Sequence, residues 1–294
     1  MNHRFLLPVV LVMLLAACTL IDGPLIADGE QATILRSGEV YESRFNPGSP
    51  RNGAHQSRSL FAFKGLPGEQ VEVVLTTDDF TPSLLGGSLR SGSLHPLDRA
   101  MGVGPGHPVR IVGEVGADGV YLFRAMAGEE GDGGAFSIEV NVFPPFVGNV
   151  FEEPERIPSI SQGSLHRGAL APGQPQTSRG SYFHVFRVVA NPGDELLFVM
   201  ESEEVDAYLS WGVAEDGDFR LLAVDDDSAG GLNAGLKVTV GEEGPYFILA
   251  HSFGAREVGD MDSSFKRPLG GGGKVGRGVW PSKLSKSRGC RARP

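Results

Sequence analysis

The sequence is poor in the residues that cross-link a chain or carry it through a bilayer. It has two cysteines, Cys18 and Cys290, and only two tryptophans. After Cys18, no stretch approaches the 18 apolar residues of a membrane-spanning helix. Long helix-forming runs are also missing, whereas 42 glycines and 20 prolines separate short apolar stretches. This pattern is typical of an all-β protein.

Basic charge is scarce outside the C-terminal end of the chain. Residues 263–294 hold nine Lys and Arg and no acidic residue, although the whole chain has a formal charge of −10. Residues 19–262 contain the 36 Asp and Glu but only 16 Lys and Arg, which leaves this body with a charge of −20. Nucleic-acid phosphates require Lys and Arg patches. We therefore exclude nucleic acid as a partner.

Residues 1–17 have the organisation of an export signal. A short basic start is followed by an apolar run that is too short to span a bilayer. The run ends in Leu15-Ala16-Ala17-Cys18, which resembles the lipobox of bacterial lipoproteins. The resemblance implies cleavage before Cys18, lipid attachment to its thiol, and a tether over residues 18–33. An ordinary secretory signal is the alternative.

Lipid on Cys18 would anchor the chain in a membrane. An aspartate directly after the lipid-bearing cysteine would resemble a signal for retention in the inner membrane. This chain has Thr19 at that position, so the outer membrane is favoured. With Cys18 acylated, Cys290 has no partner within the chain. We therefore expect no disulfide in the fold.

A self-similarity with a constant spacing of 125 residues runs through the chain. Four separated landmarks match at this spacing: Gly38 with Gly163, residues 61–69 with 186–194, Leu84 with Leu209, and residues 119–121 with 244–246. They predict two copies of one module, at residues 34–143 and 159–258. The proline-bearing, acidic segment 144–158 is the expected linker.

Short strands and tight turns alternate in both copies. A Pro-Gly turn precedes an apolar strand at residues 71–73 and at 196–200, and a Gly-led turn precedes strands at 121–125 and 246–250. No helical period intervenes. The sequence therefore predicts an all-β fold of two tandem antiparallel β-sandwich domains.

Five short motifs follow one another in the second copy. They are Tyr182-Phe183-His184-Val185-Phe186, Asn191-Pro192-Gly193-Asp194, Val205-Asp206-Ala207-Tyr208-Leu209, Asp225-Asp226-Asp227 and Gly244-Pro245-Tyr246. In this order they resemble the bacterial pre-peptidase C-terminal (PPC) domain, and the first copy matches it loosely. The resemblance implies a jelly-roll-like β-sandwich that accompanies secreted peptidases or occurs in envelope proteins without a catalytic domain.

The acidic pair that is usual in this family corresponds to Asp225 and Asp226, whereas the first copy has Ala100 and Met101 at those positions. With Asp227, and with Asp206 as a further ligand, these carboxylates are our candidate metal site. Ca²⁺ takes six to eight oxygen ligands, although the spacing is not that of an EF-hand. The alternative is a solvated turn whose carboxylates accept backbone N–H groups. Ca²⁺ is the only cofactor that we consider.

Tyr208 and Trp211 are the candidate ligand-binding residues. They flank an acidic turn, and aromatic side chains stack on ligands or anchor proteins. Packing in the core is the alternative. His184 and His251 lie inside expected strands, where a hydrogen-bonded structural histidine is typical.

No set of residues predicts a catalytic site. A Gly-x-Ser-x-Gly motif and an HExxH motif are absent, and Ser, His and Asp are scattered over separate turns. We therefore expect no enzymatic activity. A hydrolase, the third possibility, would need a triad assembled from both modules.

Residues 259–294 depart from the repeat. The expected closing strand of the first copy places four apolar side chains on one face. At the 125-residue spacing, Phe136, Ile138, Val140 and Val142 correspond to Met261, Ser263, Phe265 and Arg267. The alternation is lost, so we expect the second sandwich to lack its last strand and to expose an unpaired edge. Residues 259–294 would then be a basic, glycine-rich tail that is either disordered or the product of a frameshift.

These features predict a non-catalytic lipoprotein of the bacterial cell envelope, anchored in the outer membrane and facing the periplasm or the surface. Its modules would bind protein or polysaccharide, or assist an envelope peptidase. A calcium-binding module that uses residues 225–227 is the alternative.

Overall fold

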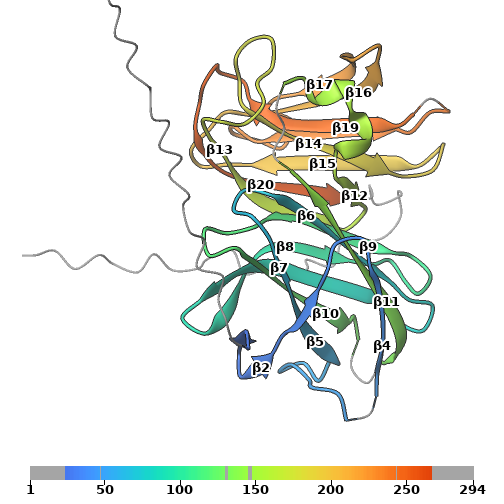
Figure 1. Ribbon diagram of the computed structural model, residues 1–294. Helices are drawn as coiled ribbons and strands as arrows, with labels where there is room; N and C mark the ends of the chain where they lie inside the picture. The colour runs from blue at the N-terminus through green and yellow to red at the C-terminus, as the bar shows by residue number, and fades with distance from the viewer. Residues whose placement is uncertain (1–23, 47, 130–131, 145–147, 243, 267–294) are drawn as a thin grey trace, which may run out of the picture.

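The protein folds into two β-sandwiches that lie one above the other in Figure 1. The computed structural model describes residues 24–46, 48–129, 132–144, 148–242 and 244–266. Over these residues the regular structure is strand, apart from two short 3-10 helices, η1 (Val150–Glu152) and η2 (Pro154–Arg156). The predicted all-β class is confirmed. In the part of the chain that the structure describes, no helix is long and apolar enough to cross a membrane.

The first sandwich consists of a five-stranded and a four-stranded sheet. The five-stranded sheet has the order β3 (Thr33–Leu35), β5 (Arg58–Lys64), β10 (Val120–Ala127), β7 (Pro82–Arg90) and β8 (Ser93–Met101). The four-stranded sheet has the order β4 (Val40–Phe45), β11 (Gly134–Phe143), β6 (Gln70–Thr76) and β9 (Val109–Glu114). Strands alternate their side chains between two faces, and the inward faces form one core in which Phe61 stacks on Phe123.

The second sandwich repeats this arrangement strand for strand. Its five-stranded sheet has the order β12 (Ser159–Ser161), β14 (Phe183–Val189), β19 (Tyr246–Ser252), β16 (Ala207–Glu215) and β17 (Asp218–Asp225). Its four-stranded sheet has the order β13 (Ser164–Leu170), β20 (Gly259–Lys266), β15 (Glu195–Glu201) and β18 (Ala234–Thr239). The core contains Trp211, which is packed between Phe198 and Tyr246.

The 125-residue spacing applies to strand boundaries and to individual backbone hydrogen bonds. Strands β5, β6, β7 and β9 begin and end 125 residues before β14, β15, β16 and β18. Gly68 and Gly193, the glycines of the two Pro-Gly turns, have the same φ of 87°, a left-handed conformation that glycine adopts without strain. Their amides donate to Val115 and Val240, which are themselves 125 residues apart. The internal repeat predicted from the sequence is therefore confirmed.

The second sandwich has its closing strand, so the predicted loss of that strand was wrong. β20 lies between β13 and β15 and pairs with both. Met261 and Phe265 are 2% and 1% exposed, and the Gly163 amide donates to the carbonyl of Phe265 as that of Gly38 does to Val140. Two core-facing side chains on an eight-residue strand suffice here because both neighbouring strands supply backbone partners. Residues 267–294 of the expected tail lie outside the described residues.

The segment before each sandwich belongs to that sandwich rather than to a tether or a linker. Residues 24–32, including β1 (Ile26–Ala27) and β2 (Glu30–Gln31), cover the outer face of the first five-stranded sheet. Residues 149–157, including η1 and η2, cover the same face of the second. The buried residues Leu25 and Ala32 correspond at the 125-residue spacing to the buried Val150 and Ile157. Residues 24–32 of the predicted tether and residues 149–157 of the predicted linker therefore pack on the sandwiches. Residues 18–23 of the predicted tether lie outside the described residues.

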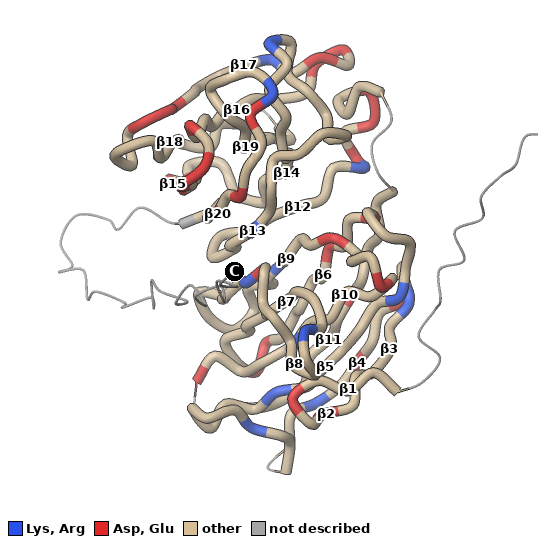
Figure 2. Tube along the Cα trace, turned by 90° about the vertical axis from the view of Figure 1, so that its left-hand side faces the viewer, with Lys and Arg blue, Asp and Glu red and all other residues tan. Residues whose placement is uncertain are grey.

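The two sandwiches share an edge. β13 pairs antiparallel with β8 through Ser164 with Ala100 and Leu165 with Arg99. This joins the five-stranded sheet of the first sandwich to the four-stranded sheet of the second, as a single sheet of nine strands. Figure 2 shows β9 close to β13 where the two halves meet.

Buried polar groups close this junction. The Asp98 carboxylate accepts a hydrogen bond from Nδ1 of His166 at 2.9 Å and another from the Tyr121 hydroxyl at 2.9 Å. Burial raises the pKa of Asp98 and that of Tyr121. Burial alone would lower the pKa of His166, but the hydrogen bond and charge of Asp98 outweigh it and raise that pKa. The buried carboxylate is thus held by two donors, one from each sandwich.

His184 lies beside this group in β14. Its ring centroid is 5.1 Å from that of His166. Burial, and after it the positive charge of His166, lowers the pKa of His184 to about 3. The ring is therefore neutral at physiological pH, and it stays in the structure as an uncharged group.

The closing strand can be tested by truncating Phe265, one of its two buried apolar side chains. We expect Phe265→Ala to lower the free energy of unfolding by about 3–5 kcal/mol, because it removes a fully buried ring. Val258→Ala, at a residue that is 54% exposed, is the control and should change stability by less than ~0.5 kcal/mol. Urea denaturation measures both. A Phe265→Ala protein as stable as the control would contradict the place of β20 in the core.

His184 should make the fold sensitive to acid. Its folded pKa of about 3 lies below the 6.5 of an unperturbed histidine, so the unfolded chain binds the proton first. The stability from neutral His184 is complete above pH 6.5 and declines as the pH falls towards 3. Between pH 7 and pH 5 the loss is about 2 kcal/mol.

His166 acts in the opposite sense, because its raised pKa contributes stability that is complete below pH 6.5 and is lost as the pH rises through the folded pKa. The comparison is therefore between the wild type and His184→Gln, each unfolded in urea at pH 7 and at pH 5. The wild type should lose about 2 kcal/mol more than the variant. Equal losses would show that His184 is not the group that responds.

Candidate ligand-binding site

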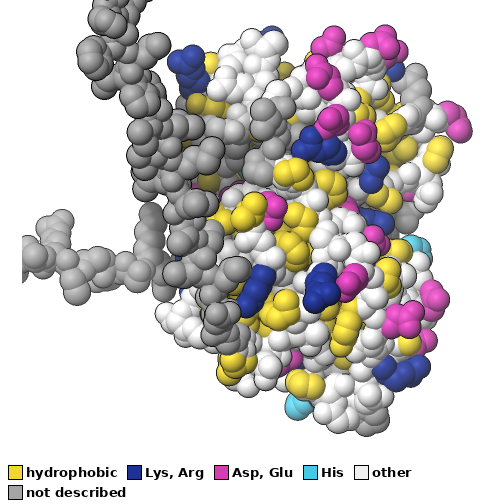
Figure 3. Space-filling model, in the orientation of Figure 1, with side chains coloured by type: hydrophobic (Ala, Val, Ile, Leu, Met, Phe, Trp, Pro, Cys, Tyr) yellow, Lys and Arg dark blue, Asp and Glu magenta, His cyan; other side chains and the backbone are white. Residues whose placement is uncertain are grey.

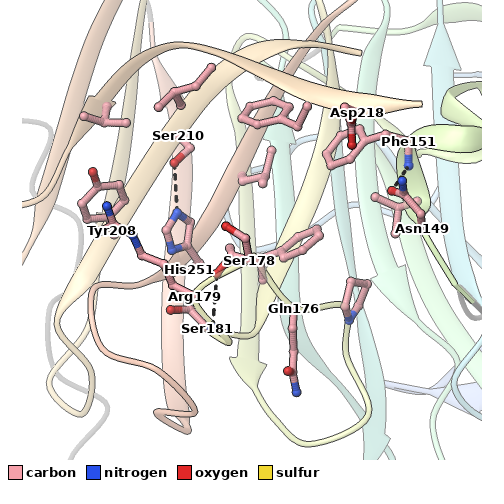
Figure 4. Close-up of a pocket in the computed structure, with 18 of the residues that line it drawn as sticks. Asn149, Phe151, Gln176, Ser178, Arg179, Ser181, Tyr208, Ser210, Asp218 and His251 are labelled. Atoms are coloured by element: carbon pink, nitrogen blue, oxygen red, sulfur yellow. Dashed lines mark hydrogen bonds between the residues drawn. The ribbon is translucent and has the colours of Figure 1, made fainter. Parts of the chain in front are cut away.

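A pocket of about 740 Å³ opens on the outer face of the second five-stranded sheet. Its base is formed by β16, β17 and β19, and its walls by residues 175–181 before β14 and by η1 with the residues that precede it. Figure 4 shows Tyr208, Ser210 and His251 at one end and Asn149 and Phe151 at the other. The volume is that of an ordinary small-molecule site.

Strand alternation decides which predicted residues reach this pocket. In β16, Ala207, Leu209 and Trp211 are buried in the core, whereas Tyr208 and Ser210 point to the outer face. Trp211 is only 3% exposed. The two candidate aromatics lie three residues apart on one strand and so face opposite sides of the sheet. Tyr208 lines the pocket and Trp211 does not.

Ser210 and His251 form a hydrogen-bonded pair in the pocket. Nδ1 of His251 lies 2.9 Å from the carbonyl oxygen of Ser252, so this nitrogen carries the proton and donates. Nε2 then accepts from the Ser210 hydroxyl at 3.0 Å. Burial, and to a smaller extent Arg179, lowers the pKa of His251. The imidazole is therefore a neutral acceptor for the serine.

Aromatic rings stand at both ends of the pocket. Tyr208 lies 4.8 Å from the ring of His251 and 5.9 Å from that of Phe253, and Phe253 is 53% exposed. At the other end, Phe151 stacks on Phe219 at 5.1 Å. Gln176, Ser178 and Arg179 add polar groups from the wall. The site combines apolar surface with a few polar groups, which is the usual composition of ligand pockets.

The corresponding face of the first sandwich is closed. At the 125-residue spacing, Leu85 and Met126 stand where Ser210 and His251 stand. Arg124, which replaces Leu249, is engaged by Asp28 at 3.0 Å and lies 3.7 Å from Glu30. The segment that covers this face thus binds it through charges as well as apolar contacts. All the residues that line the pocket of about 740 Å³ come from the second sandwich and the segment that covers it.

The predicted calcium ligands are not brought together. Asp225, at the end of β17, accepts backbone hydrogen bonds from Ser228 at 3.1 Å and Gly235 at 2.6 Å through one oxygen. This is the capping role that we gave as the alternative. Among the described residues, no group of three or more His, Cys, Asp or Glu side chains, Asp226, Asp227 and Asp206 included, is placed to hold a metal ion.

On the face shown in Figure 3, acidic and basic side chains are mixed and form no basic patch. There, Lys and Arg side chains alternate with Asp and Glu, and small hydrophobic groups lie between them. Figure 2 shows acidic segments on loops of both sandwiches. Cys18, the predicted lipid acceptor, lies outside the described residues.

Sequence reasoning missed most of the pocket. His251 was expected to be a hydrogen-bonded histidine in a strand, which is confirmed, but its partner Ser210 comes from another strand. One sequence signal for the pocket was present: Tyr208 and Ser210 alternate with the apolar residues Ala207, Leu209 and Trp211, which places them together on the outer face of the strand. Phe151 lies in the short helix η1 and Arg179 in a turn, and the position of both segments depends on the sandwich beneath them. No family model and no curated protein matches this chain, so its relation to the PPC family stays a proposal.

Proposed function

We propose that this protein is a lipid-anchored binding protein of the bacterial cell envelope that binds a segment of neutral polysaccharide in the pocket of its second sandwich. The observation that carries the proposal is the difference between two sandwiches of the same topology. One outer face is closed by its covering segment, and the other leaves a pocket of about 740 Å³ with aromatic and polar walls.

The chemistry of the pocket favours a neutral ligand that is rich in hydroxyl groups. Tyr208 and Phe253 offer partly exposed ring faces, against which the apolar faces of a sugar can pack. Arg179, Gln176 and Asp218 offer donors and acceptors at the rim. The charge of −20 on residues 19–262 disfavours anionic polymers, because like charges repel the ligand before contact.

The proposal includes a protein partner, an envelope peptidase. The resemblance of the second sandwich to the PPC domain supports an accessory role beside an envelope peptidase. Lipid on Cys18 would keep such a binding module in the membrane, with its pocket available to envelope polymers.

A hydrolase is a second candidate because of one observation. Ser210 Oγ lies 3.0 Å from Nε2 of His251, and the tautomer of the histidine is set by the carbonyl of Ser252. This is the arrangement of a nucleophile and its general base. It lies within one sandwich, whereas the sequence suggested a triad assembled from both. A backbone carbonyl takes the place at which a triad has a carboxylate.

Removing the aromatic faces should weaken polysaccharide binding. We expect Tyr208→Ala with Phe253→Ala to reduce affinity for neutral oligosaccharides of glucose or N-acetylglucosamine at least tenfold, or about 1.4 kcal/mol. Titration calorimetry on the full chain measures it. Leu66→Ala, an exposed side chain on the first sandwich, is the matched control and should leave affinity unchanged.

A labelling experiment with Ser210→Ala distinguishes the binding protein from the hydrolase. A fluorophosphonate probe labels a serine that a histidine activates. Under the binding proposal, wild type and Ser210→Ala give equal, background labelling. Labelling of the wild type that Ser210→Ala abolishes, together with no oligosaccharide binding, would replace the binding protein with a hydrolase.

The anchor has its own test. We expect Cys18→Ser to abolish incorporation of a radiolabelled fatty acid and to release the protein from the membrane fraction, because the thiol is the acceptor of the lipid. Cys290→Ser is the control and should keep the label. Unchanged labelling of Cys18→Ser would exclude the lipoprotein assignment while leaving the pocket untouched.

A further inference from the structure

The junction joins an edge strand of the five-stranded sheet in the first sandwich to an edge strand of the four-stranded sheet in the second. Each sandwich also has the other kind of edge, which has no partner strand among the described residues. β8 pairs with β13 at the junction. By the 125-residue repeat, β17 corresponds to β8, and β4 corresponds to β13. Among the described residues, β17 pairs only with β16, and β4 pairs only with β11. The molecule thus presents two edge strands, β17 and β4, whose counterparts β8 and β13 pair with each other.

The second sandwich also has a cavity at the position that corresponds to the binding site of His166 in the first. In the first sandwich, Nδ1 of His166 lies 2.9 Å from Asp98 and 3.0 Å from the carbonyl of Val112, between β8 and β9. Their counterparts, Ala223 and Lys237, line a cavity of about 580 Å³ between β17 and β18. We call this cavity the socket. Trp211, Leu222 and Tyr246 also line it.

Tyr41 on β4 is the counterpart of His166. His166 packs on Phe186 with ring centroids 5.1 Å apart and an interplanar angle of 64°. Tyr41 packs on Phe61, the counterpart of Phe186, at 5.6 Å and 70°. The two rings therefore occupy the same position on their strands. An imidazole meets a carboxylate at the inner junction. At the outer one, a phenol ring would meet the rings of Trp211 and Tyr246 in a socket that also has polar side chains, Lys237, Thr239 and Glu242.

The register of the inner junction predicts that of the outer one. Leu165 opposite Arg99 corresponds to Val40 opposite Val224. Val40 and Val224 are 62% and 42% exposed, and Leu222 beside the socket is 43% exposed. Exposed apolar side chains on an unpaired edge strand favour association with another strand. Cross-strand pairs of β-branched residues stabilise such pairing.

We propose that β17 of one copy pairs with β4 of a second copy, with Tyr41 of the second entering the socket of the first. The five-stranded sheet of one copy and the four-stranded sheet of the next would then form another nine-stranded sheet, as the junction does inside the chain. The two surfaces are different, so the interface is heterologous and copies associate head to tail.

Charge makes this association dependent on salt. The same register places Glu39 opposite Asp225, and the body of each copy is strongly acidic. Salt screens repulsion between exposed like charges. Association of the wild type should therefore be several-fold stronger at 500 mM than at 50 mM salt.

Disulfide trapping tests the register directly. Two tagged full-length chains, Val40→Cys and Val224→Cys, both with Cys290→Ser, are produced together, and their membranes are oxidised. Residues directly opposite each other on antiparallel strands come within reach of a disulfide. We expect at least tenfold more cross-linked heterodimer than when Leu66→Cys replaces Val224→Cys. Cross-linking no higher than this control, or equal cross-linking of Val40→Cys with itself, would overturn the proposal.

A complementation experiment tests the two edges separately. Val40→Lys and Val224→Lys each place a charge on one edge, and sedimentation of the full chain in detergent reports the mass. Each variant alone should be monomeric, and an equimolar mixture should form dimers, because each retains the edge that the other has lost. Leu66→Lys should associate as the wild type does. A monomeric wild type at high salt, or a mixture that stays monomeric, would overturn the proposal.

Discussion

The buried Asp98 is the constraint on which the arrangement of the two sandwiches depends. A carboxylate in the interior is costly unless donors surround it, and its donors come from both sides of the junction: Tyr121 from the first sandwich and His166 from the second. Only two residue pairs join β8 to β13. The short strand pair is a weak connection by itself. The hydrogen bonds of Asp98 reinforce it, as do those from the Ser159 amide to Glu72 and from the Ser164 hydroxyl to the Arg110 carbonyl.

The repeat explains both the similarity and the difference of the two halves. Backbone hydrogen bonds and turn glycines recur at a spacing of 125 residues, which makes the two scaffolds equivalent. Outward side chains are not restrained by the core, and here they differ. Ser210 and His251 replace Leu85 and Met126, and one face therefore has a polar pocket while the other is closed. In the proposed function, binding is a property of the second sandwich.

Local sequence signals predicted the scaffold well. Pro-Gly turns depend on two residues and one φ angle, so they identified the strand that follows in both sandwiches. The closing strand was missed because Ser263 interrupts the apolar alternation that Phe136, Ile138 and Val140 maintain in the first sandwich. β20 forms because β13 and β15 flank it on both sides, and neither neighbour is adjacent in sequence. Tyr208 and Trp211 were treated as one face, although a three-residue separation on a strand places them on opposite sides.

The sequence by itself determined the fold class, the repeat and its period, because turns and alternation are encoded within a few residues. It also carries the segment that we propose as an export signal and the cysteine that we propose as the lipid acceptor. Only the tertiary structure decided that β8 and β13 join, that Ser210 meets His251, and that residues 24–32 and 149–157 cover the sheets. Each of these contacts joins segments that are distant in the chain, and their pairing depends on packing that no local pattern specifies.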